Sequence, residues 1–122
     1  MVVVDTSVWI RYFSGHIGYR PELDHLLGTD QVAAHELIYG ELLIGNLGGR
    51  SKALARYEHF RHARLIAHND VVALTLFRKL HGRGIGWIDV HLVASALAEH
   101  MQFWTADASL AAVAEELGIA YK

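Results

Sequence analysis

Short apolar segments alternate along this chain with segments of helical spacing, and this alternation constrains the fold more than any other feature. The apolar segments suit buried strands and lie at 2–4, 31–34, 65–67 and 103–105, with a possible short edge strand at 119–121. Helices are predicted between them at 7–13, 22–27, 36–47, 51–63, 69–81, 88–99 and 108–117. This pattern predicts an α/β fold: an α/β/α sandwich with a mainly parallel central sheet.

The size of the chain fits one domain over residues 1–122. It has 122 residues, 52 % of them apolar, and a single proline, which leaves no room for a linker and a second core. No apolar run approaches the roughly 18 residues of a membrane span, and the first residues lack the basic start of a signal peptide. We therefore expect a cytoplasmic protein with no membrane partner. With no cysteine, thiol nucleophiles, zinc ribbons and iron–sulfur clusters are excluded.

Two aspartates lie at the ends of predicted strands. Asp5 directly follows the strand at 2–4, and Asp107 lies just beyond the strand at 103–105 and before a helix. Each could simply cap the helix that follows, a role that suits aspartate. However, the carboxyl ends of parallel strands meet at one edge of a sheet, where ligands bind. The two positions together predict an acidic edge.

Two further acids fall on the apolar faces of predicted helices. Glu41 shares its face with Leu37 and Ile44, and Asp89 shares its face with Val93. A buried acid is costly unless it is paired or bound to a metal. The alternatives are a position at the rim for Glu41 and an ordinary first-turn acid for Asp89.

Together these four acids predict a metal site. Four carboxylates at one edge would repel one another, so at least one pKa should be raised and a cation should be required. Oxygen ligands without cysteine suit Mg²⁺ or Mn²⁺. The histidines His35 and His91 adjoin the predicted site elements, but single histidines of this kind are more often structural.

The charge of the chain does not by itself indicate a nucleic-acid partner. The net charge is −2 with histidine neutral, whereas general nucleic-acid binders are usually basic. Two local runs could follow an RNA backbone, or else form solvated helix faces: Arg50, Lys52, Arg56, Arg61 and Arg64, and Arg78, Lys79 and Arg83.

Four short motifs, in this order, resemble those of the PIN-domain nucleases. They are VVDTSVWI at 3–10, ELLIG at 41–45, IDVHLVASA at 88–96 and WTAD at 104–107. The ordered set covers nearly the whole chain. The chain as a small stand-alone domain resembles the VapC-type toxins of toxin–antitoxin pairs.

This resemblance implies a metal-dependent endoribonuclease that a cognate antitoxin silences, usually a homodimer, with RNA as substrate and Mg²⁺ or Mn²⁺ as cofactor. Carried over by position, it implies that the catalytic and metal-binding acids are Asp5, Glu41, Asp89 and Asp107, with Asp5 and Asp89 most central. It also implies supporting hydroxyl groups at Ser7 and Thr105.

Other functions remain open at this point. An aspartyl-phosphate phosphatase or a receiver domain also places an aspartate at a strand end, but the phosphatase pattern requires a second aspartate at position 7, which is serine. A PIN-like scaffold without activity is the other alternative.

Aromatic residues in the first part of the chain bear on association. Trp9, Tyr12, Phe13 and Tyr19 are numerous for the surface of a monomer. We expect a homodimer and a groove for an apolar antitoxin segment; the alternative is that these rings fill the core.

Overall fold

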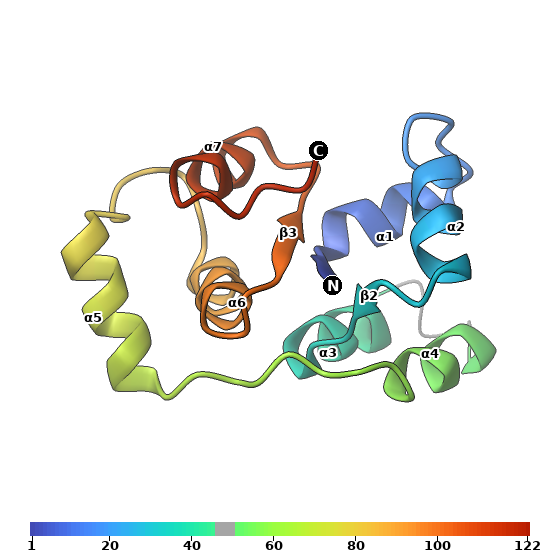
Figure 1. The fold of residues 1–122 in the computed structure, drawn as a ribbon, viewed down its shortest axis with the longest axis horizontal. Helices are drawn as coiled ribbons and strands as arrows, with labels where there is room; N and C mark the ends of the chain where they lie inside the picture. Colours follow the sequence, from blue (N-terminus) through green and yellow to red (C-terminus); the bar gives the residue numbers. More distant parts are fainter. Residues whose placement is uncertain (46–50) are drawn as a thin grey trace.

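The computed structural model describes residues 1–45 and 51–122. Figure 1 shows the strands at the centre, with α5, α6 and α7 on one side and α1, α2 and α4 on the other. In chain order the elements are β1 (Val2–Val4), α1 (Thr6–Phe13), α2 (Arg20–Gly28), β2 (Val32–Ala33), α3 (Glu36–Ile44), α4 (Ser51–Glu58), α5 (His68–Arg78), α6 (Trp87–Ala98), β3 (Gln102–Trp104) and α7 (Ala108–Glu116). The predicted α/β/α sandwich is confirmed.

The sheet is parallel and has the order β2-β1-β3. Val3 in the central strand pairs with Ala33 on one side and with Phe103 on the other. All three residues of β1 are buried, as expected for a parallel strand covered on both faces. The carboxyl ends of β1 and β3 therefore lie at the same edge, and Asp5 and Asp107 follow them.

The predicted strand at 65–67 is wrong. The chain pairs with the end of β2 before it reaches those residues, through a parallel bridge between Ala34 and His62. Ala34 N–H donates to the carbonyl of Arg61, and Ala63 N–H donates to the carbonyl of Ala34, each at 2.8 Å. Leu65 is 43 % exposed, and Ile66 packs half-buried against the smaller core cluster that contains Val71. The stretch at 65–67 therefore forms no strand. The predicted edge strand at 119–121 is reduced to one bridge, between Phe103 and Ala120.

Helices occur at every position predicted for them, with shifted ends. The helix predicted over 51–63 ends at Glu58, because the residues after it turn and pair with β2. The helix predicted over 36–47 is present as α3, which ends at Ile44. Its predicted end at Gly48 and Gly49 lies outside the described residues. In the described part of the chain, no helix is long and apolar enough to cross a membrane.

The first aromatic cluster belongs mostly to the core, so the expectation that it is exposed is wrong. Trp9 is only 5 % exposed, and Tyr12, Phe13 and Tyr19 pack half-buried against the core. The Trp9 ring stacks on Phe13 at a centroid distance of 5.9 Å and meets Tyr57 edge-on at 5.7 Å. These rings pack α1 against α4, so their number does not indicate a dimer.

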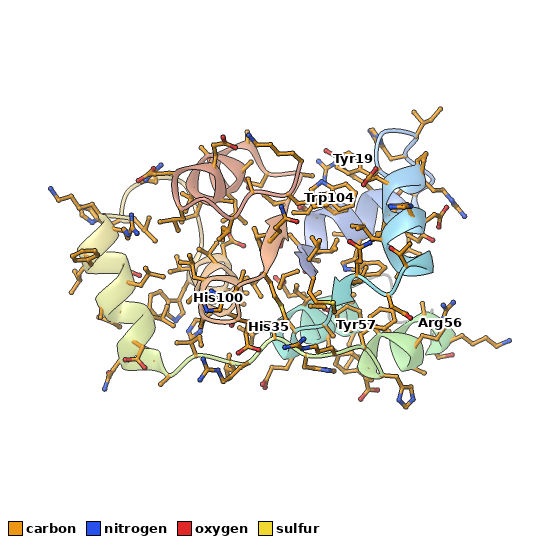
Figure 2. All side chains as sticks on the ribbon, viewed as in Figure 1. Tyr19, His35, Arg56, Tyr57, His100 and Trp104 are labelled. Atoms are coloured by element: carbon orange, nitrogen blue, oxygen red, sulfur yellow. The ribbon has the colours of Figure 1, made fainter. Side chains whose placement is uncertain are left out.

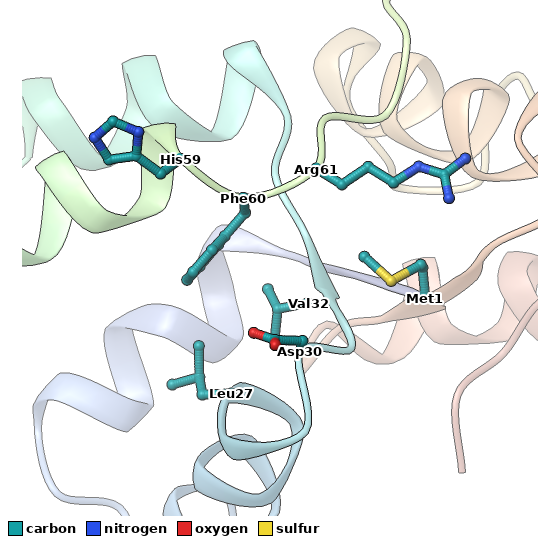
Figure 3. A pocket seen from close by; sticks show the side chains of 7 residues that line it. All are labelled: Met1, Leu27, Asp30, Val32, His59, Phe60 and Arg61. Atoms are coloured by element: carbon teal, nitrogen blue, oxygen red, sulfur yellow. The ribbon is translucent and has the colours of Figure 1, made fainter.

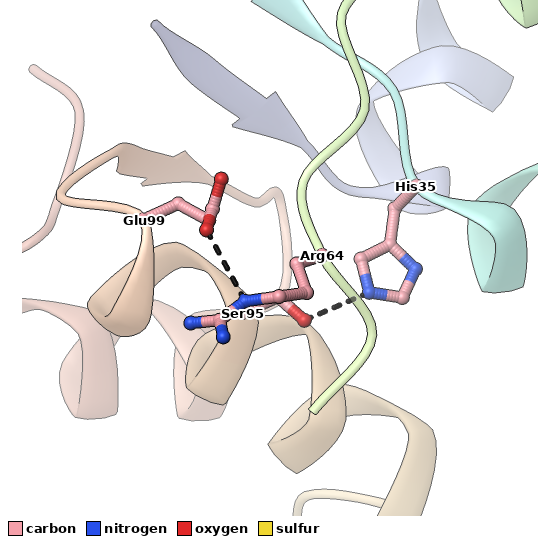
Figure 4. A network of polar contacts seen from close by, with 4 residues as sticks. All are labelled: His35, Arg64, Ser95 and Glu99. Atoms are coloured by element: carbon pink, nitrogen blue, oxygen red, sulfur yellow. Dashed lines mark hydrogen bonds and ion pairs between the residues drawn. The ribbon is translucent and has the colours of Figure 1, made fainter. Parts of the chain in front are cut away.

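His35 joins the sheet to two helices. Its side chain is fully buried and caps α3, with Nδ1 accepting the N–H of Leu37 at 3.1 Å. Nε2 then carries the ring proton and lies 2.9 Å from Ser95 Oγ on α6 (Figure 4). Burial, together with the nearby His91 and His62, lowers the pKa of His35 to about 4. The structural interpretation of this histidine is confirmed.

Candidate active site

Asp5 lies at the centre of the acidic edge and does not act as a helix cap. It is the residue before α1, but its side chain makes no capping bond. Instead, Oδ2 accepts the hydroxyl of Ser7 at 2.7 Å and that of Thr105 at 2.8 Å. The side chain is buried, with 6 % of the residue exposed. The two hydroxyls therefore hold one carboxylate oxygen in place at the tip of β1.

The same two hydroxyls join the ends of β1 and β3. Ser7 Oγ accepts the N–H of Ala106 at 3.0 Å, and Thr105 Oγ1 accepts the N–H of Asp107 at 3.1 Å. The two hydroxyl oxygens are 3.3 Å apart. Each hydroxyl can thus accept from the backbone and donate to Asp5, which gives the carboxylate a fixed direction.

Glu41 is tied to the residue after Asp5. Thr6 Oγ1 donates to Glu41 Oε1 at 2.7 Å across 35 residues of sequence. The glutamate is half-buried on α3, so neither a fully buried nor a freely solvated position describes it. Thr6 was not among the predicted site residues. Its position between Asp5 and Ser7, in a run of three polar residues after a buried strand, was the available signal.

Asp89 interacts electrostatically with two of the other acids. Its Oδ2 accepts the N–H of Gly86 at 3.0 Å, the residue before α6. Burial raises the pKa of Asp89, and the charges of Asp5 and Asp107 raise it further, while the Gly86 N–H opposes this shift. The expectation that one of the four acids has a raised pKa is confirmed.

Asp107 does cap a helix. Its Oδ1 accepts the N–H of Leu110 at 3.1 Å at the start of α7. The side chain is exposed, unlike that of Asp5. Its charge nevertheless reaches Asp89, so the capping role and the place in the acidic edge coexist in one residue.

The donor set of this edge suits a hard divalent cation. Asp5 Oδ1 and Asp89 Oδ1 accept no hydrogen bond from any described residue. Within residues 1–45 and 51–122, no three acidic or histidine side chains form a ready-made group for a metal ion. Mg²⁺ usually keeps several water ligands and takes one or two carboxylates from the protein. A pair such as Asp5 and Asp89, completed by water, meets that requirement.

A cavity elsewhere among the described residues does not share this chemistry. One of about 200 Å³ lies beside Met1 and Asp30, which precede β1 and β2 (Figure 3). Its lining is mixed, with Phe60 and Val32 next to Arg61. None of the four predicted acids lines it, so it is separate from the acidic edge.

A parallel sheet with acids beyond the ends of its strands, and with further acids on the two helices beside them, defines the class of this protein. The PIN domain family matches residues 2–116, and the chain belongs to this family. Over 121 residues it is 35 % identical to Ribonuclease VapC32 of Mycobacterium tuberculosis, in both strain CDC 1551 / Oshkosh and strain ATCC 25618 / H37Rv. Each alignment covers 98 % of this chain and 95 % of the relative.

Opposite changes in thermal stability should follow from replacing Asp89 and Asp107. In EDTA, Asp89→Asn should raise stability by about 1 kcal/mol, or roughly 4 °C in Tm. The ionised form is disfavoured by burial and by two neighbouring charges, and the amide oxygen can still accept the Gly86 N–H. Asp107→Ala should lower stability by about 1 kcal/mol, because the bond to Leu110 N–H is lost.

Melting curves in EDTA and in Mn²⁺ test these signs. Mn²⁺ should stabilise the wild type by binding the native state, and Asp89→Asn should gain less. If Asp89→Asn melts lower than the wild type in EDTA and Mn²⁺ has no effect on either protein, Asp89 is only a first-turn acid.

Proposed function

We propose that this protein is a Mg²⁺- or Mn²⁺-dependent endoribonuclease and the toxin of a VapBC-type toxin–antitoxin pair. The observation that carries the proposal is the buried carboxylate of Asp5 at the carboxyl edge of the sheet, held there by Ser7 and Thr105. The charges of Asp5 and Asp107 also reach Asp89. The 35 % identity to a ribonuclease of the VapC type, over 98 % of this chain, supports the same activity. We further propose that residues 1–122 act as one domain in the cytoplasm, where RNA is available.

Asp5 and Asp89 are the proposed principal ligands of the metal, with Glu41 and Asp107 completing the acidic set. When bound, such an ion lowers the pKa of a water molecule and neutralises charge on the phosphodiester. Ser7 and Thr105 support Asp5 by fixing its Oδ2, which leaves Oδ1 for the ion. No side-chain nucleophile is needed. Attack of water on phosphorus expels the 3′ oxygen and leaves a 5′-phosphate and a 3′-hydroxyl.

The experiment that tests the function is cleavage of total cellular RNA by the purified protein. Products should appear in Mg²⁺ or Mn²⁺, should be absent in EDTA, and should carry 5′-phosphates. Expression of the protein should stop growth, and co-expression of the adjacent small open reading frame should restore it. No cleavage together with no acid-dependent metal binding would instead favour a scaffold.

An apolar groove supports the proposed antitoxin partner. A cavity of about 100 Å³ between α1, α2 and α4 is lined by Trp9, Tyr12, Phe13, Leu27, Ala53, Arg56 and Phe60. Its aromatic floor suits an apolar peptide segment, and Arg56 at its rim suits an acidic residue of that segment. Arg56 is exposed on α4, as Figure 2 shows.

We also propose a homodimer formed through α5. Leu76 and Phe77 are neighbours on this helix and are 68 % and 81 % exposed. Large apolar side chains exposed next to each other indicate an interaction surface. α5 lies at the left edge of the molecule in Figure 1, where a second copy can pack against it.

Phe77→Asp should therefore convert a dimer into a monomer. The buried charge would oppose association, whereas the fold should survive because the ring makes little contact with the core. Light scattering at tens of micromolar measures the mass. Ile17→Asp is the matched control, since Ile17 is 87 % exposed but lies before α2. A wild-type protein of monomer mass would contradict the dimer.

A further inference from the structure

Arg11 lies beside the hydroxyl network that holds Asp5. It follows Ser7 by one turn of α1, and its side chain folds back along the helix, so that Nη1 donates to the carbonyl of Ser7 at 3.0 Å. The hydroxyl of the same Ser7 donates to Asp5. The guanidinium group is thus held against the residue that orients the central carboxylate.

One aromatic ring lies next to this arginine, and a second ring stacks on the first. Arg11 Cζ lies 5.8 Å from the centroid of the Tyr19 ring. Tyr19 in turn stacks on Trp104, with centroids 5.9 Å apart and planes at 26°, and Figure 2 shows the two rings side by side. Trp104 ends β3, and its carbonyl accepts the N–H of Asp5 at 2.8 Å. The row of Arg11, Tyr19 and Trp104 therefore leads directly to the acidic edge.

Arg11 has no carboxylate partner among the described residues. Three other cations, Arg64, Arg83 and Lys122, are paired with glutamates. Arg11 is half-buried, and its bond to the Ser7 carbonyl uses one of its five N–H groups. A partly desolvated guanidinium next to an acidic site, with donors left over, suits an anion brought by a ligand.

We propose that Arg11 binds a phosphate of the RNA chain adjacent to the one that is cleaved. This inference rests on the proposed function, since it names a substrate contact of the same site. The acidic edge alone repels RNA, whereas a fixed arginine at its border attracts one phosphate and sets the register of the strand. The Ser7 carbonyl and the Tyr19 ring, which is itself stacked on Trp104, orient the guanidinium, so the contact is prepared before RNA arrives.

The first test measures how RNA binding depends on salt. The probe is a 5′-fluorescein-labelled single-stranded RNA of mixed sequence, about twice the length of a typical single-strand site, with Ca²⁺ in place of Mg²⁺ or Mn²⁺. Each phosphate contact contributes about 0.7 to the slope of log K against log salt for a single strand. Arg11→Ala should reduce that slope by about 0.7 and weaken binding roughly tenfold at low salt. Arg11→Lys should retain most of the slope, because the charge remains.

The second test separates substrate binding from a structural role. In Mn²⁺, Arg11→Ala should raise KM for RNA roughly tenfold and leave kcat within about threefold. Arg20→Ala is the matched control, because Arg20 also lies over a tyrosine ring, that of Tyr12 at 5.3 Å, on α2. It should leave KM and the salt slope unchanged. If Arg11→Ala does not fold, Arg11→Gln replaces it, since an amide can still donate to the Ser7 carbonyl.

The outcomes distinguish this subsite from the proposed function. If the wild type cleaves RNA but Arg11→Ala leaves KM and the salt slope unchanged, the subsite alone is overturned. Equal changes in Arg11→Ala and Arg20→Ala, or a loss of kcat without a change in KM, also overturn it. A wild type that binds RNA through Arg11 but cleaves none in Mg²⁺ or Mn²⁺ overturns the nuclease and leaves the subsite. A wild type that neither binds nor cleaves RNA overturns both.

Discussion

Asp5→Asn should lower RNA cleavage at least about 1000-fold, or roughly 4 kcal/mol in transition-state stabilisation, while the protein stays folded. The amide oxygen can take the place of Oδ2 and keep the hydroxyl bonds from Ser7 and Thr105, at 2.7 and 2.8 Å in the wild type. The other position then carries a neutral NH₂ group, which cannot bind a cation. Initial rates in Mn²⁺, together with a melting curve of each protein, measure the two effects.

A matched control for this change is Asp30→Asn. Asp30 is exposed, lies at the other end of the sheet before β2, and has a φ of 54°, which asparagine adopts readily. It should cleave at the wild-type rate. Cleavage by Asp5→Asn at the wild-type rate would remove Asp5 from the catalytic site, and a large loss of stability would show that its charge is structural.

The position of Asp5 could be predicted because it depends on backbone topology. A buried strand that ends in an acid places that acid at the carboxyl edge of a parallel sheet. The same reasoning from β3 places Asp107, and in the structure the charges of both aspartates reach Asp89. Helical spacing was equally sufficient to put Asp89 near the start of α6.

The details of the site depend on contacts that spacing does not specify. The bond from Thr6 to Glu41 joins residues 35 positions apart, and the bond from Thr105 to Asp5 joins residues 100 apart. Whether an acid caps a helix also depends on a rotamer: Asp107 accepts the Leu110 N–H, whereas Asp5 turns to Ser7 and Thr105. The sequence alone is compatible with either role, a helix cap or a member of the acidic edge, for both residues.

Strand prediction failed at 65–67 for a related reason. Apolar composition indicates that a segment can pair, but only the register of its neighbours decides which residues do pair. Here His62 reaches Ala34 first. The exposed Leu65 that results is a surface feature, and composition alone gave no sign of it.

Lowering the pH from 7.5 to 4.5 should remove about 2.5 kcal/mol of stability through His35 alone. Its pKa in the folded protein is about 4, against 6.5 for an unperturbed histidine. The unfolded chain therefore binds a proton over this interval that the folded protein does not bind. The stability that neutral His35 provides is complete above the unfolded pKa and declines as the pH falls towards 4.

The geometry explains why the folded protein resists this proton. Nδ1 accepts the Leu37 N–H and Nε2 faces Ser95 Oγ, so a second ring proton would point at a donor and break the cap of α3. Nearby charge from His91 and His62 adds to the cost of burying the cation. Arg64 and Glu99 lie next to this network and pair with each other at 3.3 Å, as Figure 4 shows.

Urea unfolding at pH 7.5 and pH 4.5 measures the effect when the wild type is compared with His35→Asn. Asparagine can cap α3 and does not titrate, so the variant should lose about 2.5 kcal/mol less than the wild type across this interval. His100→Asn is the matched control, because His100 is exposed and its φ of 56° suits asparagine. It should follow the wild type. The ring protons of His35 should also keep their NMR shifts down to about pH 5. If the His35 ring titrates near pH 6.5 and all three proteins lose equal stability, the buried ring accepts its proton without cost. The cap of α3 then does not depend on neutral His35.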